Sequence, residues 1–274
     1  MSSQDTIPEN PGEPLSFDTS VSHPARTYDY WLGGKDNYEA DRRVGDLVSA
    51  TQPGVRAAVR ANRAFLRRAV EFLASEAGVR QFLDIGTGLP TADNTHEVAQ
   101  RIAPDSRIVY VDNDPIVLAH ARALLTSTEQ GATAYIQADA RDPATIVSEA
   151  AATLDLGQPV AVMLLAVLHF IRDEDDPGRI VTTVMDAMPP GSYLTISAAT
   201  SDFDTETITR AAGTFNSQKV AAQFILRTRE QIARYFGGLE LVEPGLVPLP
   251  QWRAVTAPDP DLVAGYGAVA RKPA

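Results

Sequence analysis

Short apolar runs that end in polar residues recur through the middle of the chain, within residues 81–93, 107–115, 134–143 and 159–170. The first three end in an acidic residue, as in FLDIGTG, whereas the fourth, PVAVMLLAVLHF, is a continuous apolar stretch before His169. Such a stretch is typical of a central parallel strand that is buried on both faces. The four runs therefore predict parallel strands of an α/β sheet, with polar groups at their carboxyl ends.

Helical spacing of apolar residues predicts a long amphipathic helix over residues 55–75. Its arginines at positions 56, 60, 63 and 67 form a basic stripe, which is either a solvated face paired with nearby acids or, through Arg63 or Arg60, a partner for a ligand carboxylate. Later expectations are a helix from residue 180 that Pro189 stops, a strand at 192–198, a mostly helical stretch at 205–234, and strands at 239–247 and 266–271.

A glycine turn, Gly86-Thr87-Gly88, follows the first predicted strand, two residues after Asp84. Glycine suits such a turn because the backbone often needs φ above zero there, and because a Cβ would hold a ligand away from the main chain. The ligand so admitted is usually a nucleotide or nucleoside. The dinucleotide pattern G-x-G-x-x-G needs a third glycine at position 91, which is Thr91 here, so the turn disfavours NAD.

Two further strand ends place acidic residues where a nucleoside would bind. Asp112, followed by Asn113, lies 24 positions after Gly88, near the spacing of about 20 at which a carboxylate of βαβ folds accepts hydrogen bonds from the ribose. Asp139 and Ala140 end the next strand. Ligands of doubly wound sheets bind outside the carboxyl ends of the strands, so these ends should converge on one crevice. Alternatively, each acid only caps a helix or forms a turn.

The N-terminal part of the chain has no strand or helix period. Residues 1–22 are polar and contain prolines, which predicts a mobile tail. Residues 24–43 combine three tyrosines, a tryptophan and the pair Gly33-Gly34 with alternating charges. Aromatic residues beside a glycine hinge suit a lid over a binding site, although they would equally suit a surface segment that packs on the core.

Three blocks carry a resemblance to a known family: ARTYDYWLGGKDNYEADR, NRAFLRRAVEFLA and FLDIGTGLPT. From about residue 24 to 271 the chain resembles the actinobacterial S-adenosyl methyltransferases, first catalogued as a domain of unknown function. The resemblance implies a Rossmann-like class I methyltransferase fold with a seven-stranded, mostly parallel sheet of order 3-2-1-4-5-7-6, flanked by helices and closed by an antiparallel hairpin. It also implies a tail at 1–22, a helical lid at 23–75 and a methyltransferase core at 76–274.

The same resemblance implies S-adenosyl-L-methionine as the cofactor. Asp139 and Ala140 would then face the adenine, while Tyr28 and Arg63 would face the carboxylate of the methionine part. The full expected set of cofactor residues is Tyr28, Arg63, Asp84, Gly86, Thr87, Gly88, Asp112, Asn113, Asp139, Ala140 and Ala166.

Composition narrows the partners. The 274 residues carry a net charge of −11, which disfavours binding to the phosphates of nucleic acids and favours a small-molecule or protein acceptor. There is no cysteine, which excludes disulfides and thiolate ligands, and the four histidines show no metal-binding pair. No apolar run is long enough for a membrane span, and no secretory signal is visible, so we expect a cytoplasmic protein. The sequence leaves the oligomeric state open.

His169, just after the fourth strand, is the candidate catalytic base, because an unperturbed imidazole accepts a proton near neutral pH. The alternative is that His169 only packs or hydrogen-bonds beside the cofactor. Two other functions also stay open: a protein that binds S-adenosylmethionine or its demethylated product without catalysis, and an NAD(P)-dependent oxidoreductase on the same kind of sheet.

Overall fold

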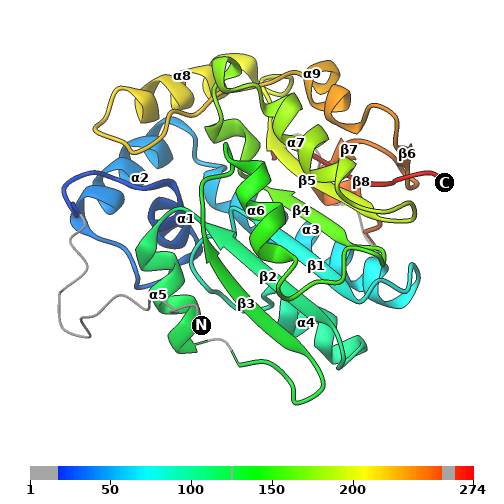
Figure 1. The fold of residues 1–274 in the computed structure, drawn as a ribbon. Coiled ribbons are helices and arrows are strands. Elements are labelled where there is room, and N and C mark those ends of the chain that lie inside the picture. The colour runs from blue at the N-terminus through cyan, green and yellow to red at the C-terminus, as the bar shows by residue number, and fades with distance from the viewer. Residues whose placement is uncertain (1–17, 125, 255–262) are drawn as a thin grey trace.

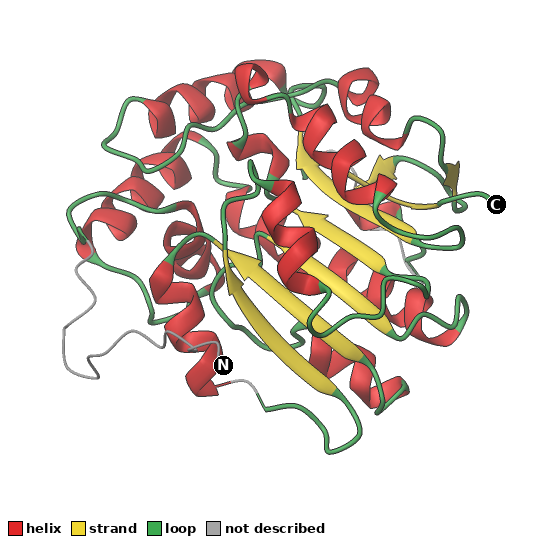
Figure 2. Cartoon of the chain, viewed as in Figure 1, coloured by secondary structure: helices red, strands yellow, loops and turns green. Residues whose placement is uncertain are grey.

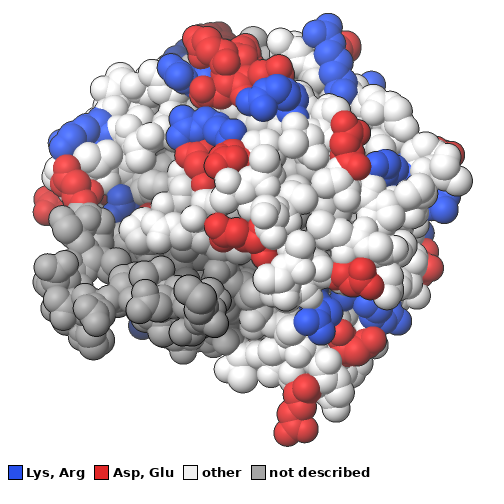
Figure 3. All heavy atoms as spheres, viewed as in Figure 1, with Lys and Arg blue, Asp and Glu red and all other residues white. Residues whose placement is uncertain are grey.

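A computed structural model describes residues 18–124, 126–254 and 263–274 (Figure 1). Most of the predicted tail, residues 1–17, lies outside the described residues. Within the described part, none of the helices combines the length and apolarity that a bilayer crossing requires. Lys and Arg side chains are interspersed with Asp and Glu on the face shown in Figure 3.

One mixed sheet forms the centre of the molecule, in the order β3-β2-β1-β4-β5-β8-β6, with β7 paired to β8. The first five strands are parallel, and β8 runs antiparallel to its three neighbours. The predicted fold class and strand order are confirmed, except that the short β7 makes an eighth strand and shifts the numbering. The strands are β1 Gln81–Ile85, β2 Arg107–Asp112, β3 Ala132–Gln137, β4 Ala161–Leu165, β5 Tyr193–Ala199, β6 Glu240–Leu241, β7 Val247–Pro248 and β8 Gly265–Arg271.

Helices cover both faces of this sheet (Figure 2). In Figure 1, α6 and α7 lie in front of the sheet and α3 and α4 behind it, while the strand arrowheads point toward α1 and α2. The α-helices are α1 Pro24–Leu32, α2 Glu39–Thr51, α3 Val55–Ser75, α4 Thr95–Ile102, α5 Pro115–Leu124, α6 Pro143–Ala150, α7 Pro177–Asp186, α8 Thr205–Asn216 and α9 Arg229–Ala233; short 3-10 turns are η1 Leu168–Phe170, η2 Asp173–Asp175, η3 Arg234–Phe236 and η4 Leu249–Gln251.

The core has two layers because the central strands are buried on both faces. Every residue of β1 and β4 is buried, as the uninterrupted apolar runs predict. Side chains on one face pack with α6 and α7, and those on the other face pack with α3 and α4. Burial of both faces leaves the strand ends as the places where polar residues can meet a ligand.

Helix α3 begins and ends where the apolar spacing predicts, at Val55 and Ser75. Its apolar face packs on the sheet, and the fully buried ring of Phe65 meets Trp252 edge to face, with ring centroids 5.4 Å apart. The arginines of the basic stripe lie in different environments. Arg67 pairs with Glu71 in the same helix, Arg60 is exposed, and Arg63 turns toward the carboxyl ends of the strands.

Residues 24–43, for which the sequence shows no period, fold as two helices joined by a glycine loop. The pattern is hidden because the buried face of α1 is polar: Arg26, Thr27 and Asp29 point inward. Asp29 accepts hydrogen bonds from the backbone N–H of Asp36 and from the Asn37 amide. A Cβ on Gly34 would overlap this Asp29 carboxylate, so the second glycine of the pair is required by close approach.

Two expectations for the C-terminal third hold only in part. The stretch 205–234 is helical only in α8 and α9, and the intervening chain runs as a loop whose Val220 bridges to Ser22 beside α1. The strand expected at 239–247 is reduced to β6 and β7, two residues each, which flank a turn. In both places the chain follows its neighbours in space rather than its local apolar spacing.

Packing of α3 on the sheet gives a test of stability. Replacing Phe65 with Ala removes a fully buried ring and leaves a cavity, so the free energy of unfolding should fall by about 3–5 kcal/mol in urea denaturation. Arg60→Ala in the exposed face of the same helix should change it by no more than about 0.5 kcal/mol. A loss below about 1 kcal/mol for Phe65→Ala would contradict the packing described here.

Candidate functional site

A cleft of about 470 Å³ lies at the carboxyl ends of the strands, between the sheet and the N-terminal helices. The structure places all eleven expected cofactor residues on the lining of this cleft. They come from α1, α3, the last residues of β1 and β2, and the loops that follow β1, β2, β3 and β4. The convergence follows from topology, because the carboxyl ends of neighbouring parallel strands share one edge of the sheet.

The turn after β1 brings bare main chain to the floor of the cleft. Gly86 has φ +75, and a Cβ there would lie 2.5 Å from a methyl carbon of Val167. Thr87 holds the turn by donating its hydroxyl to the carbonyl of Asp84 at 3.0 Å. The positive φ and the contact with Val167 both require glycine at position 86, because a side chain there would clash with Val167 and the residue would adopt an unfavourable backbone conformation.

Asp84 lies beneath this turn and is 5% exposed. It accepts a hydrogen bond from the Thr95 hydroxyl at 2.6 Å. Burial raises the pKa of Asp84 to about 6, although the hydrogen bond from Thr95 and the positive charge of Arg63 act in the opposite direction. The carboxylate is thus held in the cleft at an electrostatic cost that a cationic ligand would relieve.

Asp112 ends β2 with its carboxylate facing the glycine turn. One oxygen accepts the N–H of Gly88 and the other the N–H of Asp114, both at 2.9 Å. Burial raises its pKa as well. Each carboxylate oxygen has two lone-pair directions, so Asp112 keeps acceptor capacity for two hydroxyl groups of a ligand.

Asp139 lies across the cleft in a more exposed loop. Both of its oxygens accept from the guanidinium of Arg141, at 2.8 and 2.5 Å, and Asn113 donates to it at 3.4 Å. The hydrogen bond from Arg141 is the main reason why its pKa is lowered. Asp139 is therefore an ionised acceptor, and Ala140 follows it on the cleft wall.

Arg63 reaches the cleft from α3, where it donates to the carbonyls of Ala92 and Asp93, each at 2.9 Å. These bonds use one of its terminal nitrogens, and a guanidinium carries five N–H donors in all. Arg63 therefore keeps the capacity to bind a carboxylate.

A buried chain of hydrogen bonds crosses the site from α1 to β4. Tyr28 donates to the carbonyl of Val59 at 3.0 Å and accepts from the Asn62 amide at 2.9 Å. Ser197 donates to the other end of the Asn62 amide at 2.6 Å and accepts from the N–H of Ala166 at 2.9 Å. The chain fixes Ala166 at φ +56, a conformation unusual for a residue with a side chain.

Sequence reasoning missed two members of this hydrogen-bond network as site residues, Ser197 and Asn62. Only Asn62 left a signal in the sequence. It lies seven positions after Val55 and three after Val59 and is 8% exposed, so it is a polar residue on the apolar face of α3. A polar side chain at such a position is buried only with partners. That single break in the apolar pattern was the available signal.

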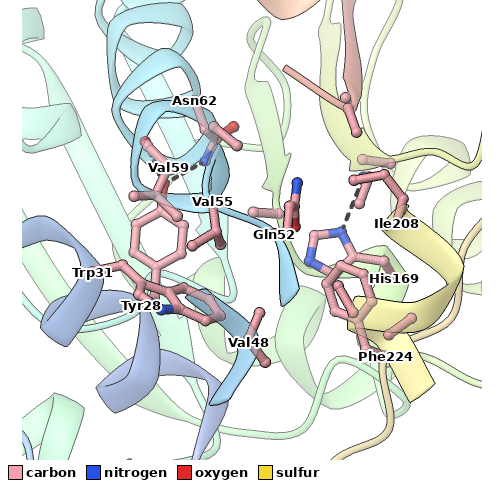
Figure 4. A pocket seen from close by; sticks show the side chains of 18 of the residues that line it. Tyr28, Trp31, Val48, Gln52, Val55, Val59, Asn62, His169, Ile208 and Phe224 are labelled. Atoms are coloured by element: carbon pink, nitrogen blue, oxygen red, sulfur yellow. Dashed lines mark hydrogen bonds between the residues drawn. The ribbon is translucent and has the colours of Figure 1, made fainter. Parts of the chain in front are cut away.

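A second cavity of about 120 Å³ adjoins the cleft (Figure 4). Tyr28, Asn62, Ala166, Pro24 and Phe170 line both spaces and form the boundary between them. Most of the other lining side chains are apolar or aromatic and come from α2, α3, α8 and the loops after β4 and β5.

His169 lines this second cavity and not the cleft, and of the eleven expected cofactor residues only Tyr28 and Ala166 line the cavity with it. It is 6% exposed, and its Nδ1 accepts the N–H of Ala199 at 3.3 Å. Burial, together with the positive charge of Arg227, lowers the pKa of His169 to about 3. In this environment His169 is a neutral imidazole and a weak base.

Ion pairs hold the N-terminal segment against the rim of the cleft. Arg26 Nε lies 3.5 Å from Asp41 in α2 and 3.9 Å from Asp114 in the loop after β2. His23 Nδ1 lies 3.3 Å from the same Asp114 carboxylate. Because Asp114 also donates its N–H to Asp112, the position of α1 is tied to the loop that carries Asp112. No group of three His, Asp or Glu residues suited to a metal ion occurs in the described ranges.

The strand order and the cleft at the strand ends define a class I methyltransferase fold. The chain belongs to the S-adenosyl methyltransferase family, whose model matches residues 11–273, and the resemblance indicated by the sequence motifs is confirmed. A search of the curated proteins found no match.

Solved structures agree with this assignment. A DUF574-family protein from Streptomyces avermitilis is 48% identical, with a TM-score of 0.90 over 93% of this chain and 99% of that chain. A candidate methyltransferase from Thermobifida fusca is 41% identical, with a TM-score of 0.86 over 94% and 97%. The N-methyltransferase NodS from Bradyrhizobium japonicum in complex with S-adenosyl-L-homocysteine is 14% identical, with a TM-score of 0.50 over 91% and 100%, a likeness of fold alone.

The raised pKa of Asp84 predicts a pH dependence of stability. The folded protein binds this proton more tightly than the unfolded chain, whose carboxyl has the usual value of 3.8. The free energy of unfolding should therefore decrease as the pH rises from about 4 to about 6, and this group alone should account for roughly 3 kcal/mol of the decrease. Asp84→Asn cannot ionise, so urea denaturation at pH 4 and pH 7 should show wild type losing stability relative to the variant. If the free energy of unfolding changes equally with pH in the two proteins, ionisation of Asp84 does not destabilise the fold and the prediction is wrong.

Proposed function

We propose that the cleft binds S-adenosylmethionine and that the protein transfers its methyl group to a small-molecule acceptor bound in the adjoining cavity. The supporting observation is that the eleven residues expected from the sequence to hold this cofactor line a single cleft. The chemistry of these residues fits the cofactor: acceptors for hydroxyls and an amine, a guanidinium for a carboxylate, and main chain without side chains where the ligand must approach closely.

Each part of the cofactor has a partner in this proposal. Asp112 accepts hydrogen bonds from the ribose hydroxyls, using the acceptor capacity that Gly88 and Asp114 leave. Asp139 and Ala140 face the adenine, where the ionised Asp139 carboxylate accepts from the amino group. Arg63 binds the carboxylate of the methionine part, because a guanidinium pairs with a carboxylate through parallel hydrogen bonds.

Asp84, Gly86, Thr87 and Gly88 form the floor, and Asn113 and Ala166 complete the walls. Tyr28 is limited as a donor to the cofactor carboxylate, because its single hydroxyl proton already goes to Val59. Donation to the cofactor would require this proton to turn away from α3. We therefore assign Tyr28 first to the boundary between cleft and cavity.

When bound, the cofactor would supply an activated methyl group on a sulfonium sulfur: an acceptor lone pair would form the new bond to carbon, and the carbon–sulfur electron pair would stay on sulfur. The chain's own contribution is to align the acceptor and to exclude water, and such positioning can lower a barrier by several kcal/mol. His169 is too weak a base, with a pKa of about 3, to accept the acceptor's proton in the free protein. The described cavity lining offers no stronger base, so a proton on the accepting atom would leave for bulk water only after methyl transfer, with the product.

Cofactor selectivity tests the proposal against an oxidoreductase on the same sheet. Titration calorimetry should show saturable binding of S-adenosylmethionine and S-adenosylhomocysteine and no binding of NAD, since Thr91 stands where the dinucleotide pattern needs glycine. Binding of NAD in preference would reject the proposal. If S-adenosylmethionine binds but its labelled methyl group is never transferred to any acceptor, the protein is a non-catalytic binder.

Asp112→Ala tests the ribose contact. Losing hydrogen bonds to an ionised carboxylate should weaken S-adenosylmethionine binding by about 1.5–3 kcal/mol, or roughly 10- to 150-fold in Kd, by calorimetry. Asp105→Ala is a matched control, because Asp105 is exposed and lies outside the cleft lining, and its Kd should equal that of wild type. Unchanged affinity in Asp112→Ala would remove this residue from the site.

A further inference from the structure

The lining of the cavity beside the cleft restricts the charge of the molecule that can bind there. Its described lining contains no Asp, Glu, Lys or Arg. A charged group buried without a partner is strongly disfavoured, because neither water nor an opposite charge compensates it. An acceptor with a carboxylate, phosphate or ammonium group in this space would therefore bind poorly.

Most polar side chains of the lining are already committed to the protein. Tyr28, Asn62 and Ser197 bond one another, and Trp31 donates its indole N–H to the carbonyl of Gly45 at 3.1 Å. Gln52 is half-buried, its side chain makes no hydrogen bond within the described residues, and it lies beside His169 in the lining (Figure 4).

The second polar side chain of the lining that keeps a free hydrogen-bonding group is His169. A backbone N–H can only donate, so Nδ1, which accepts from Ala199, carries no proton. The neutral ring therefore carries its proton on Nε2, and Figure 4 shows this nitrogen on the side of the ring that faces the cavity. His169 thus offers one hydrogen-bond donor to a bound molecule.

Size and shape favour a single ring. An apolar protein cavity of about 150 Å³ can hold one benzene molecule, and this one measures about 120 Å³. Aromatic side chains surround the space: the ring of Phe224 lies 4.7 Å from that of His169 and 5.4 Å from that of Phe170, centroid to centroid. Aromatic rings at such separations pack favourably edge to face or offset.

We infer that the acceptor is an uncharged, mainly apolar molecule that inserts one six-membered ring into this cavity and accepts a hydrogen bond from Nε2 of His169 through an oxygen or nitrogen atom. The inference rests on the proposed function for the assignment of the cavity as the acceptor site. Binding of small ring compounds to the cavity can be measured without methyl transfer.

Ligand-observed NMR on protein saturated with S-adenosylhomocysteine provides the test, with phenol, benzoate and benzylammonium as probes of one ring size. Phenol should bind at least about tenfold more tightly than either charged probe. Benzoate or benzylammonium binding as tightly as phenol would overturn the inference, and so would absence of phenol binding while S-adenosylhomocysteine binds. Failure of S-adenosylhomocysteine itself to bind would instead reject the proposed function.

Variants locate the probe. Ala211→Phe fills the cavity from α8 and should abolish phenol binding while leaving the Kd of S-adenosylhomocysteine unchanged, because Ala211 does not line the cleft. Thr209→Phe on the exposed side of the same helix should leave both ligands unaffected. Ala212→Leu is a milder filling variant that serves the same purpose if Ala211→Phe does not fold. Phenol binding that survives in a folded filling variant would contradict the assignment.

His169→Phe tests the hydrogen bond. Wild type should prefer phenol to fluorobenzene, which has a similar ring but a much poorer acceptor, and the variant should bind the two about equally. A purely structural role of His169 would weaken both probes alike and preserve the preference, which would exclude His169 as the donor.

Discussion

The buried hydrogen-bond chain from Tyr28 through Asn62 and Ser197 to Ala166 is the interaction on which the organisation of the site depends. It joins α1, α3, β5 and the end of β4, and each of its side chains satisfies another. Because buried polar groups are costly when unpaired, the chain favours one arrangement of these elements over others. Three of these residues, Tyr28, Asn62 and Ala166, also lie on the boundary between the cleft and the apolar cavity, so the network that orders the fold helps to divide the site into two spaces.

The cleft holds two buried carboxylates, Asp84 and Asp112. Burial raises the pKa values of both Asp84 and Asp112, which shows that the fold holds these carboxylates in place against their own solvation preference. Functional sites often contain such groups, because a ligand supplies the compensating interactions. A cofactor with a sulfonium and an ammonium group matches this potential, whereas the adjoining cavity, with no charged side chain among its described lining, matches the opposite kind of molecule.

Two anchors keep the N-terminal helices over this site. The ion pairs of Arg26 connect α1 to α2 and to the loop after β2, and Asp29 ties the glycine loop to the end of α1. The segment around Val220 pairs with Ser22 and covers the cleft from the other side. The cover over the cleft therefore combines α1 with the loop between α8 and α9, and the position of α1 is linked through Asp114 to the carboxylate of Asp112.

The sequence by itself determined the sheet, the long helix and the residues that line the cleft. Uninterrupted apolar runs identify strands buried on two faces, and the polar residue after each run must lie at the shared edge of a parallel sheet, so the cleft at Asp84, Asp112 and Asp139 was predictable from local pattern. Only the tertiary structure decided the fold of residues 24–43, where a polar helix face is buried by partners distant in the chain. It also decided the place of Asn62, the second cavity and the protonation of His169, because burial and hydrogen bonding between distant segments leave no periodic trace in the sequence.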